Sequence, residues 1–139
     1  MIQKVAQLVM LIRDYDEAIG FYTGKLGFEI LEDTRRSETK RWVRVAPPGS
    51  GCSSLFAKSS SAQQDACVGN QTGGRVFAFL NTDNFDAYYN KLKSNGVEFV
   101  GSPRNEGFGK VVVFMDLYGN KWDLIEPQKP YFNPASNSS

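Results

Sequence analysis

The chain has 139 residues, of which 41% are hydrophobic, and this suits one compact domain with its own core rather than a disordered chain. Its 16 basic and 15 acidic residues give a net charge of +1, so charge offers no argument for nucleic acid or an anionic membrane as a partner. Arg13 and Asp14 interrupt the first apolar stretch too early for a membrane-spanning helix, and no signal-peptide cleavage site follows. We therefore expect a cytoplasmic protein with Cys52 and Cys67 as free thiols.

The first half of the chain predicts a strand, a helix and three more strands. Residues 4–12 alternate between two faces, as a strand does. Asp14, with Glu17 three residues on, is typical of a helix start, and Gly27 is typical of a helix end. The helix would bury an apolar stripe made of Ala18, Phe21, Tyr22 and Leu26. The three strands are predicted at FEILED, KRWVRVA and SSLFAK, with the turn PPGSG before the last.

The same order of elements returns 69 residues later. Asp83 stands in the place of Asp14, Gly96 in the place of Gly27, and GVEFV resembles GFEIL. The second helix would bury Phe85, Tyr88, Tyr89 and Leu92. Its strands are predicted at about 97–100, 110–115 and 121–126, and the segment GSPRNEGFG (residues 101–109) is predicted to be a flexible loop or hairpin.

This repetition predicts an α+β fold in which two βαβββ modules form a curved, mostly antiparallel, cup-shaped sheet. The domain is predicted to span residues 1–127, with modules at 4–58 and 74–127. A polar, glycine-rich linker would occupy residues 59–73, and a C-terminal tail would follow at 128–139. The alternative is an accidental similarity between two ordinary α+β segments.

Three stretches carry a resemblance to a known family: RDYDEAIGFYTGKLGFEI in the first module, and DNFDAYYNKLKSNGVEF and FMDLYGNKWDLIEP in the second. The last is similar to a closing signature of the form DPDGN…EL.EP, with Asp116, Gly119 and Asn120 in its turn. Together they resemble the vicinal oxygen chelate superfamily, which includes glyoxalase I, extradiol dioxygenases, fosfomycin-resistance enzymes and bleomycin-resistance proteins. The resemblance covers about residues 4–127, and it is more specific for fold than for activity.

In the metal-dependent members of that superfamily, each module supplies two ligands from inward-facing strands. The resemblance places these positions at Gln7, Phe77, Asp123 and, within one residue, Ser54. Gln7 is similar to a glutamine ligand of some glyoxalase I enzymes, and Asp123 keeps an oxygen donor, whereas Phe77 has none and its neighbours are Val76 and Ala78. A catalytic divalent ion normally takes three protein ligands, and this chain has no histidine. We therefore expect no metal and no other cofactor.

Strand alternation predicts an aromatic inner face with a few polar groups, as small-molecule pockets have. The ligand-binding candidates are Gln7, Trp42, Arg44, Ser54, Phe56, Phe77, Phe79 and Asp123, joined by Phe108 from the loop near the rim. The aromatic rings are suited to stack on a planar ligand, and Gln7, Ser54 and Asp123 to orient it. Alternatively, the phenylalanines belong to the core. Arg44 would then pair with an acidic residue on a neighbouring strand, or with Asp123.

Three function classes are considered. The first is a metal-independent homodimeric binding protein for a planar or aromatic small molecule, as the resemblance to drug-sequestering bleomycin-resistance proteins implies. Those proteins hold a cationic drug in acidic clefts, whereas this balanced chain with an inward Arg44 favours an uncharged or anionic ligand. The alternative is a glyoxalase-superfamily lyase, isomerase or dioxygenase with a degraded metal site, in which Asp123 acts as a base if burial raises its pKa. A module that acts through its surface is a third class, and no residue singles it out.

Overall fold

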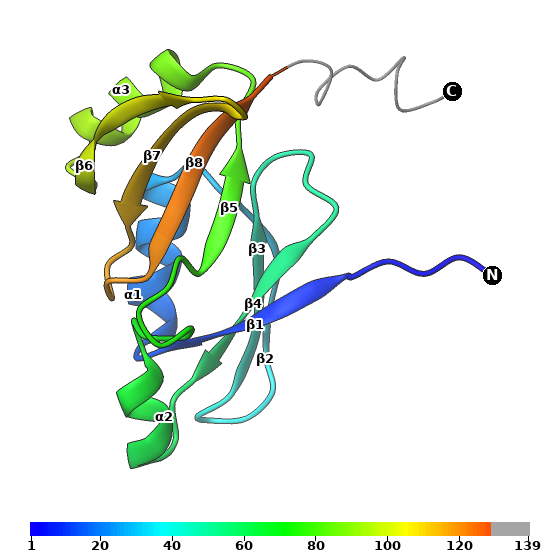
Figure 1. Ribbon diagram of the computed structural model, residues 1–139. Coiled ribbons are helices and arrows are strands. Elements are labelled where there is room, and N and C mark those ends of the chain that lie inside the picture. Colours follow the sequence, from blue (N-terminus) through cyan, green and yellow to red (C-terminus); the bar gives the residue numbers. More distant parts are fainter. Residues whose placement is uncertain (129–139) are drawn as a thin grey trace. The chain divides into compact units, whose positions relative to one another are not determined.

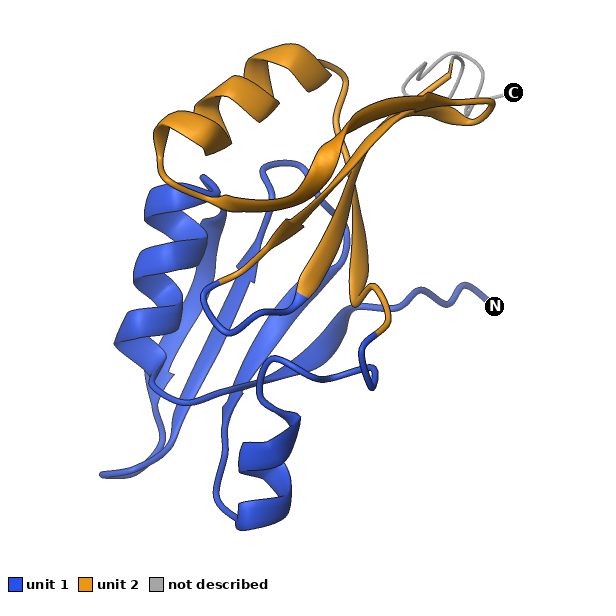
Figure 2. Cartoon of the chain, turned by 60° about the vertical axis from the view of Figure 1, so that its left-hand side comes forward, with its two compact units in different colours: residues 1–74, 117–120 blue, residues 75–116, 121–139 orange. Residues whose placement is uncertain are grey.

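The structure is a computed structural model that describes residues 1–128, so nearly all of the predicted C-terminal tail lies outside the described residues. The chain divides into two compact units (Figure 2). Unit 1 comprises residues 1–74 and 117–120, and unit 2 comprises residues 75–116 and the chain from 121 onward. Each unit contains one four-stranded sheet, which confirms the predicted α+β class. No helix among residues 1–128 is long and apolar enough to span a membrane.

Unit 1 has the strand order β1-β4-β3-β2, in which β1 runs parallel to β4 and the other pairs are antiparallel (Figure 1). Its strands are β1 (Gln7–Ile12), β2 (Glu29–Arg35), β3 (Arg41–Ala46) and β4 (Ser53–Lys58). The helix α1 (Tyr15–Ile19) continues as a π-helical stretch, η1 (Gly20–Lys25). Asp14 caps α1 as predicted, because its Oδ2 accepts a hydrogen bond from the Glu17 amide at 2.8 Å. Gly27, with φ 78°, ends the helical segment as predicted.

The helical segment of unit 1 packs on one face of the sheet through Tyr22. The Tyr22 ring lies 5.6 Å from the Phe56 ring and 5.4 Å from the Phe28 ring, between centroids. Tyr22 is fully buried, and Met10 and Val43 beneath it are also 0% exposed. Burial of large apolar side chains is the main force that holds such a helix to its sheet. Trp42 alternates with the buried Val43 along β3 and therefore belongs to the opposite face of the sheet.

Unit 2 repeats the topology, with strand order β5-β8-β7-β6 and β5 parallel to β8. Its strands are β5 (Ala78–Asn81), β6 (Glu98–Glu106), β7 (Gly109–Met115) and β8 (Lys121–Pro127), and its helix is α3 (Phe85–Ser94). The core contains Trp122 stacked on Phe114, with ring centroids 6.0 Å apart. Asn84, rather than the predicted Asp83, caps α3, because its Oδ1 accepts from the Ala87 amide at 3.2 Å.

Two segments differ from the sequence-based expectation. The predicted linker contains a short helix, α2 (Ala62–Cys67), whose N-terminus is capped by Ser61. Of the two forms predicted for residues 101–109, a loop or a hairpin, the structure has the hairpin, but with a longer strand than expected, because β6 continues to Glu106 and only a tight turn separates it from β7. A register shift between Val100 and Arg104 accommodates the glycine and proline of this stretch within the ladder.

Candidate functional site

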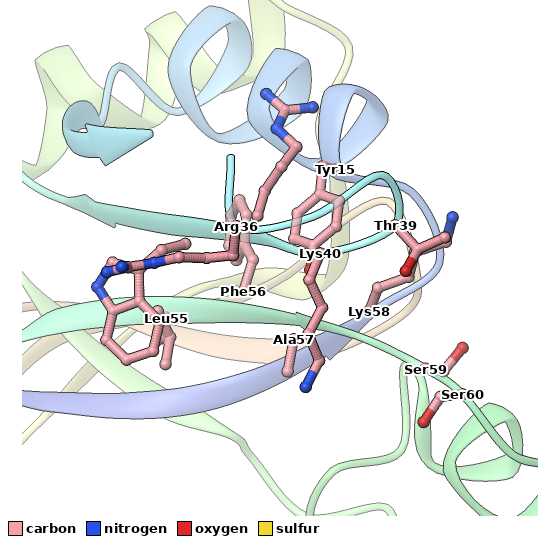
Figure 3. A pocket seen from close by; sticks show the side chains of 12 residues that line it. Tyr15, Arg36, Thr39, Lys40, Leu55, Phe56, Ala57, Lys58, Ser59 and Ser60 are labelled. Atoms are coloured by element: carbon pink, nitrogen blue, oxygen red, sulfur yellow. The ribbon is translucent and has the colours of Figure 1, made fainter. Parts of the chain in front are cut away.

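Unit 1 contains a pocket of about 480 Å³, close to the turn between β2 and β3 and the C-terminal end of β4 (Figure 3). Its apolar wall includes Tyr15, Trp42 and Leu55. Its basic residues are Arg36, Lys40, Arg41 and Lys58, and none of the residues that line it is acidic. The pocket therefore combines an aromatic surface with an excess of positive charge.

The β2–β3 turn, residues 36–40, holds two of these basic residues at the pocket. The Arg36 amide donates to the Lys40 carbonyl at 2.8 Å, which closes the turn. Ser37 Oγ accepts hydrogen bonds from the amides of Thr39 and Lys40, at 3.3 and 3.1 Å. Because serine satisfies backbone amides inside tight turns in this way, the local sequence itself orders the turn.

Arg41 has its charge satisfied by two carboxylates of unit 1. Its guanidinium contacts Asp33 at 2.7 Å and Asp16 at 2.8 Å, and its Nε also donates to Asp33 Oδ1 at 3.2 Å. The hydrogen bonds that Arg41 donates to Asp33 lower the pKa of that carboxyl group, and the hydrogen bonds that it donates to Asp33 and Asp16 raise the pKa of its own guanidinium. The guanidinium also lies over the Tyr15 ring, 5.3 Å from its centroid. Arg41 is thus a structural link between α1, β2 and β3.

The other three cations of the pocket, Arg36, Lys40 and Lys58, differ from Arg41 in their partners. The guanidinium carbon of Arg36 lies 5.5 Å from the centroid of the half-buried Trp42 ring, a cation–π distance. Within residues 1–128, no carboxylate forms an ion pair with Arg36, Lys40 or Lys58. All three side chains are exposed, so their charges are accessible to a molecule entering the pocket.

Of the residues predicted to bind a ligand, Trp42 and Phe56 line this pocket. Ser54 and Phe56 were predicted to lie on the same face of the sheet as Trp42, and this prediction is wrong because the register of β4 differs by one residue. In the β3–β4 register, Phe56 lies opposite the buried Val43, and Ser54 lies opposite the buried Val45. Phe56 is only 1% exposed because its ring packs against Tyr22 on the helix-covered face. Leu55, opposite Arg44, takes the predicted position beside Trp42.

Gln7 and Arg44 also belong to unit 1. Gln7 begins β1, where it lies opposite Ser53 of β4 and is half-buried. Arg44 Nε pairs with Glu32 of the neighbouring strand at 3.3 Å, which confirms the cross-strand pairing considered from the sequence. Its Nη1 lies 3.4 Å from Ser53 Oγ. Arg44 is therefore occupied by side chains of its own sheet.

The remaining candidates belong to unit 2. The half-buried Phe77 packs edge-on against Trp122, 5.7 Å between centroids, so its ring joins the aromatic group of the core. Phe79 is 66% exposed and lies opposite Asp123 in the β5–β8 register. Phe108 is 56% exposed in the turn between β6 and β7.

Asp123 is the titratable candidate with a shifted pKa. Burial raises the pKa of its carboxyl group, and the positive charge of Arg104 opposes that shift. Its Oδ1 atom is buried and accepts no hydrogen bond from any described residue. A buried carboxylate oxygen without a partner is costly, and such groups are candidates for proton transfer or ligand contact.

The donors at the family's metal positions do not fit a catalytic divalent ion. Phe77 offers no donor atom, and Ser54 lies on the same strand face as Phe56. One amide, at Gln7, and one carboxylate, at Asp123, are left, fewer than the three protein ligands such ions normally take. Within the described chain, no three or more Cys, Asp or Glu residues gather as metal ligands would.

The basic group formed by Arg36, Lys40 and Lys58 was not predicted from the sequence. The first two flank the turn in the segment RRSETKR, whose density of charge was the available signal. Lys58 comes from a different strand, and only the antiparallel pairing of β3 with β4 brings it to the same pocket.

The two repeated units, with their matching sheets, define a class of α+β proteins built from paired βαβββ modules. Residues 4–124 match the family model of the Glyoxalase/Bleomycin resistance protein/Dioxygenase superfamily. The chain therefore belongs to this superfamily. The family predicted from the sequence is thus confirmed.

Three similar proteins illustrate this membership. An uncharacterised protein of Shewanella frigidimarina (strain NCIMB 400) is 50% identical over 126 residues, which cover 89% of this chain and 93% of that protein. The crystal structure of UcmS2 matches with a TM-score of 0.79 and 28% identity, covering 91% of this chain and 99% of UcmS2. The crystal structure of TnmS3, an antibiotic-binding protein from Streptomyces sp. CB03234, matches with a TM-score of 0.72 and 27% identity, covering 91% and 98%.

Proposed function

We propose that this protein is a metal-independent binding protein that holds a planar, aromatic small molecule, such as an antibiotic, in the pocket of unit 1. The observation that carries the proposal is the pocket of about 480 Å³ with Trp42 on its wall. Sites for drug-sized ligands typically have volumes of about 300–1,000 Å³ and aromatic walls with a few polar groups. The half-buried Trp42 offers a large flat surface that needs no rearrangement of the core.

Two further observations support binding rather than metal chemistry. TnmS3, which is similar over 91% of this chain, is an antibiotic-binding protein. The donors at the family's metal positions, with a phenylalanine at one of them, do not supply the ligands that metal-dependent catalysis needs. Binding needs only shape, stacking and a few polar contacts, and the aromatic and polar side chains that line the pocket of unit 1 support the proposal.

The test is a calorimetric titration of the protein with a panel of planar aromatic antibiotics in the presence of EDTA. We expect at least one of them to bind, and Trp42→Ala to weaken that binding about tenfold or more, because aromatic anchors dominate such sites. Trp122→Phe is the matched control, since Trp122 is 5% exposed and packs in the core of unit 2. The proposal fails if no member of the panel binds, or if Trp42→Ala leaves the affinity of the bound ones unchanged.

The predicted homodimer belongs to the same proposal. Val9 is 57% exposed on β1 and Phe79 is 66% exposed on β5, and each strand is at the edge of its sheet. Exposed apolar side chains on edge strands are typical of surfaces that another chain covers. We expect light scattering to give twice the chain mass of 15.5 kDa, and Phe79→Lys to shift the population toward the monomer. A cytoplasmic location is proposed as well, because Cys52 and Cys67 are free thiols.

A second candidate function, a lyase or isomerase of the superfamily, is favoured by Asp123. Burial raises the pKa of its carboxyl group, which is the direction that favours a carboxylate base, and its buried Oδ1 lacks a hydrogen-bond partner among the described residues. Equilibrium dialysis against Ni²⁺, Zn²⁺, Mn²⁺ and Fe²⁺ separates the two candidates. Stoichiometric metal binding that is lost in Asp123→Ala would favour the enzyme over the binding protein.

A further inference from the structure

We propose that the pocket of unit 1 selects anionic ligands: planar aromatic molecules that carry a carboxylate, sulfonate or phosphate group. This inference rests on the proposed binding function and specifies its ligand class. Overall charge does not suggest it, because the chain has a net charge of only +1. The selectivity comes from the local arrangement of charges around the pocket.

The charges that line the pocket have one sign. Arg36, Lys40, Arg41 and Lys58 contribute to the wall, and no aspartate or glutamate does. The carboxylates that bond to side chains of pocket-lining residues are Asp16 and Asp33, which bind Arg41, and Asp65, which accepts from the Ser59 hydroxyl. An anion in the pocket therefore meets cations without meeting a carboxylate on the wall.

Three of the four cations have no carboxylate partner within residues 1–128. Arg41 binds two carboxylates, so it contributes little free charge to a ligand. Arg36, Lys40 and Lys58 form no ion pair within the described chain. Holding three like charges around one cavity is unfavourable, and an anionic ligand would relieve their repulsion. A cationic ligand would increase it.

The aromatic and cationic groups are also adjacent. The Arg36 guanidinium carbon lies over the Trp42 ring, 5.5 Å from its centroid, so a positive charge is held at one face of the indole. A ligand whose anionic group is attached directly to an aromatic ring suits this arrangement, because its charge would reach Arg36 while its ring would lie against the part of the indole that Arg36 does not cover. Guanidinium also binds carboxylate, sulfonate and phosphate oxygens through paired hydrogen bonds.

The test compares three probes that share one ring system and differ in charge: naphthoate, naphthylmethanol and naphthylmethylammonium. Isothermal titration at low ionic strength measures each affinity. We expect naphthoate to bind about tenfold more tightly than the neutral alcohol, as charge-assisted hydrogen bonds allow, and the ammonium compound to bind most weakly. The preference should shrink as NaCl is added, because the Debye length falls from about 30 Å at 0.01 M to about 8 Å at 0.15 M.

Variants then show which residues cause the preference for the anionic probe. The double variant Arg36→Gln/Lys40→Gln should lose most of the preference for naphthoate over naphthylmethanol, because Lys58 is then the one pocket cation left without an ion pair within residues 1–128. Both side chains are exposed, so the fold should be retained, which circular dichroism checks. Lys4→Gln removes one positive charge from an exposed residue before β1 that does not line the pocket, and it should retain the full preference.

The outcomes separate this inference from the proposed function. If the neutral or cationic probe binds as tightly as naphthoate and Trp42→Ala weakens all three, the binding function stands and the anion preference is wrong. If naphthoate is preferred but the double variant keeps the preference, the assignment to Arg36 and Lys40 is wrong. If none of the probes and none of the antibiotics binds, the pocket is not a ligand site and both proposals fail.

Discussion

The two units share an order of elements but differ in where they place their tryptophan. In unit 1, Trp42 is half-buried on β3, beside the pocket and under the Arg36 guanidinium. In unit 2, Trp122 is 5% exposed on β8 and stacks on Phe114. The same topology thus supplies one indole to a surface pocket and one to a core. The comparison shows that strand position and face, rather than residue type, decide whether an aromatic side chain is free to bind.

The acidic groups of the two units differ in a parallel way. Asp33 of unit 1 is held by Arg41, which lowers its pKa. Asp123 of unit 2 has a buried oxygen with no partner in the described chain, and burial raises its pKa. One carboxylate stabilises its unit at neutral pH, whereas the other reduces stability there.

The largest expected effect is a difference in stability between variants of the two tryptophans, and it would sharpen the comparison between the units. Trp122→Ala should lower the free energy of unfolding by about 3–5 kcal/mol, because a large ring leaves a cavity in the core of unit 2. Trp42→Ala should lower it by less than about 1 kcal/mol, because the ring already borders open space. Urea denaturation followed by circular dichroism measures both. Equal losses would mean that Trp42 is as much a part of the core as Trp122.

A smaller effect concerns the ion pairs of unit 1. Asp33→Asn should lower the free energy of unfolding at neutral pH by about 1 kcal/mol, since the pair with Arg41 is partly exposed and screened. Because the folded-state pKa of Asp33 lies below its ordinary 3.8, its contribution is present above that value and is lost as pH falls through the folded pKa. Denaturation of both proteins from neutral pH into acid checks this. A difference that persists undiminished at low pH would contradict it.

The smallest expected effect has the opposite sign and lies in unit 2. The folded-state pKa of Asp123 lies above its ordinary 3.8, so its contribution to stability falls as pH rises through that interval. Asp123→Asn should therefore raise the free energy of unfolding at neutral pH, by roughly 0.5 kcal/mol given partial solvent screening, and the gain should vanish in acid. Thermal unfolding across that pH range measures it. A loss of stability at neutral pH would show that the Asp123 carboxylate is paired.

Local sequence patterns were sufficient for most of the fold. The alternation of apolar and polar residues predicted the strands of both units, and Asp14 marked the start of the first helix. Gly27 and Gly96 marked the ends of the two helical segments, because they adopt positive φ values of 78° and 80°. The cap of α3 was misplaced by one residue because Asp83 and Asn84 are both good capping residues.

The candidate site was harder to predict from the sequence. Trp42 was found because it alternates with Val43 on a strand with a clear period. The register of β4 was missed because Leu55, Phe56 and Ala57 are consecutive apolar residues, so alternation does not choose a face. The contact of Phe56 with Tyr22, 34 residues earlier in the chain, makes that choice. The basic group converges from two parts of the chain, which only strand pairing reveals.

The central claim is that a ligand binds at Trp42 without a metal ion. Fluorine NMR of protein labelled with 5-fluorotryptophan tests it directly, because the two units carry one tryptophan each. With EDTA present, naphthoate should shift the Trp42 resonance saturably while the Trp122 resonance stays in place. A shift confined to Trp122, or one that appears only after a divalent metal is added, would contradict the account.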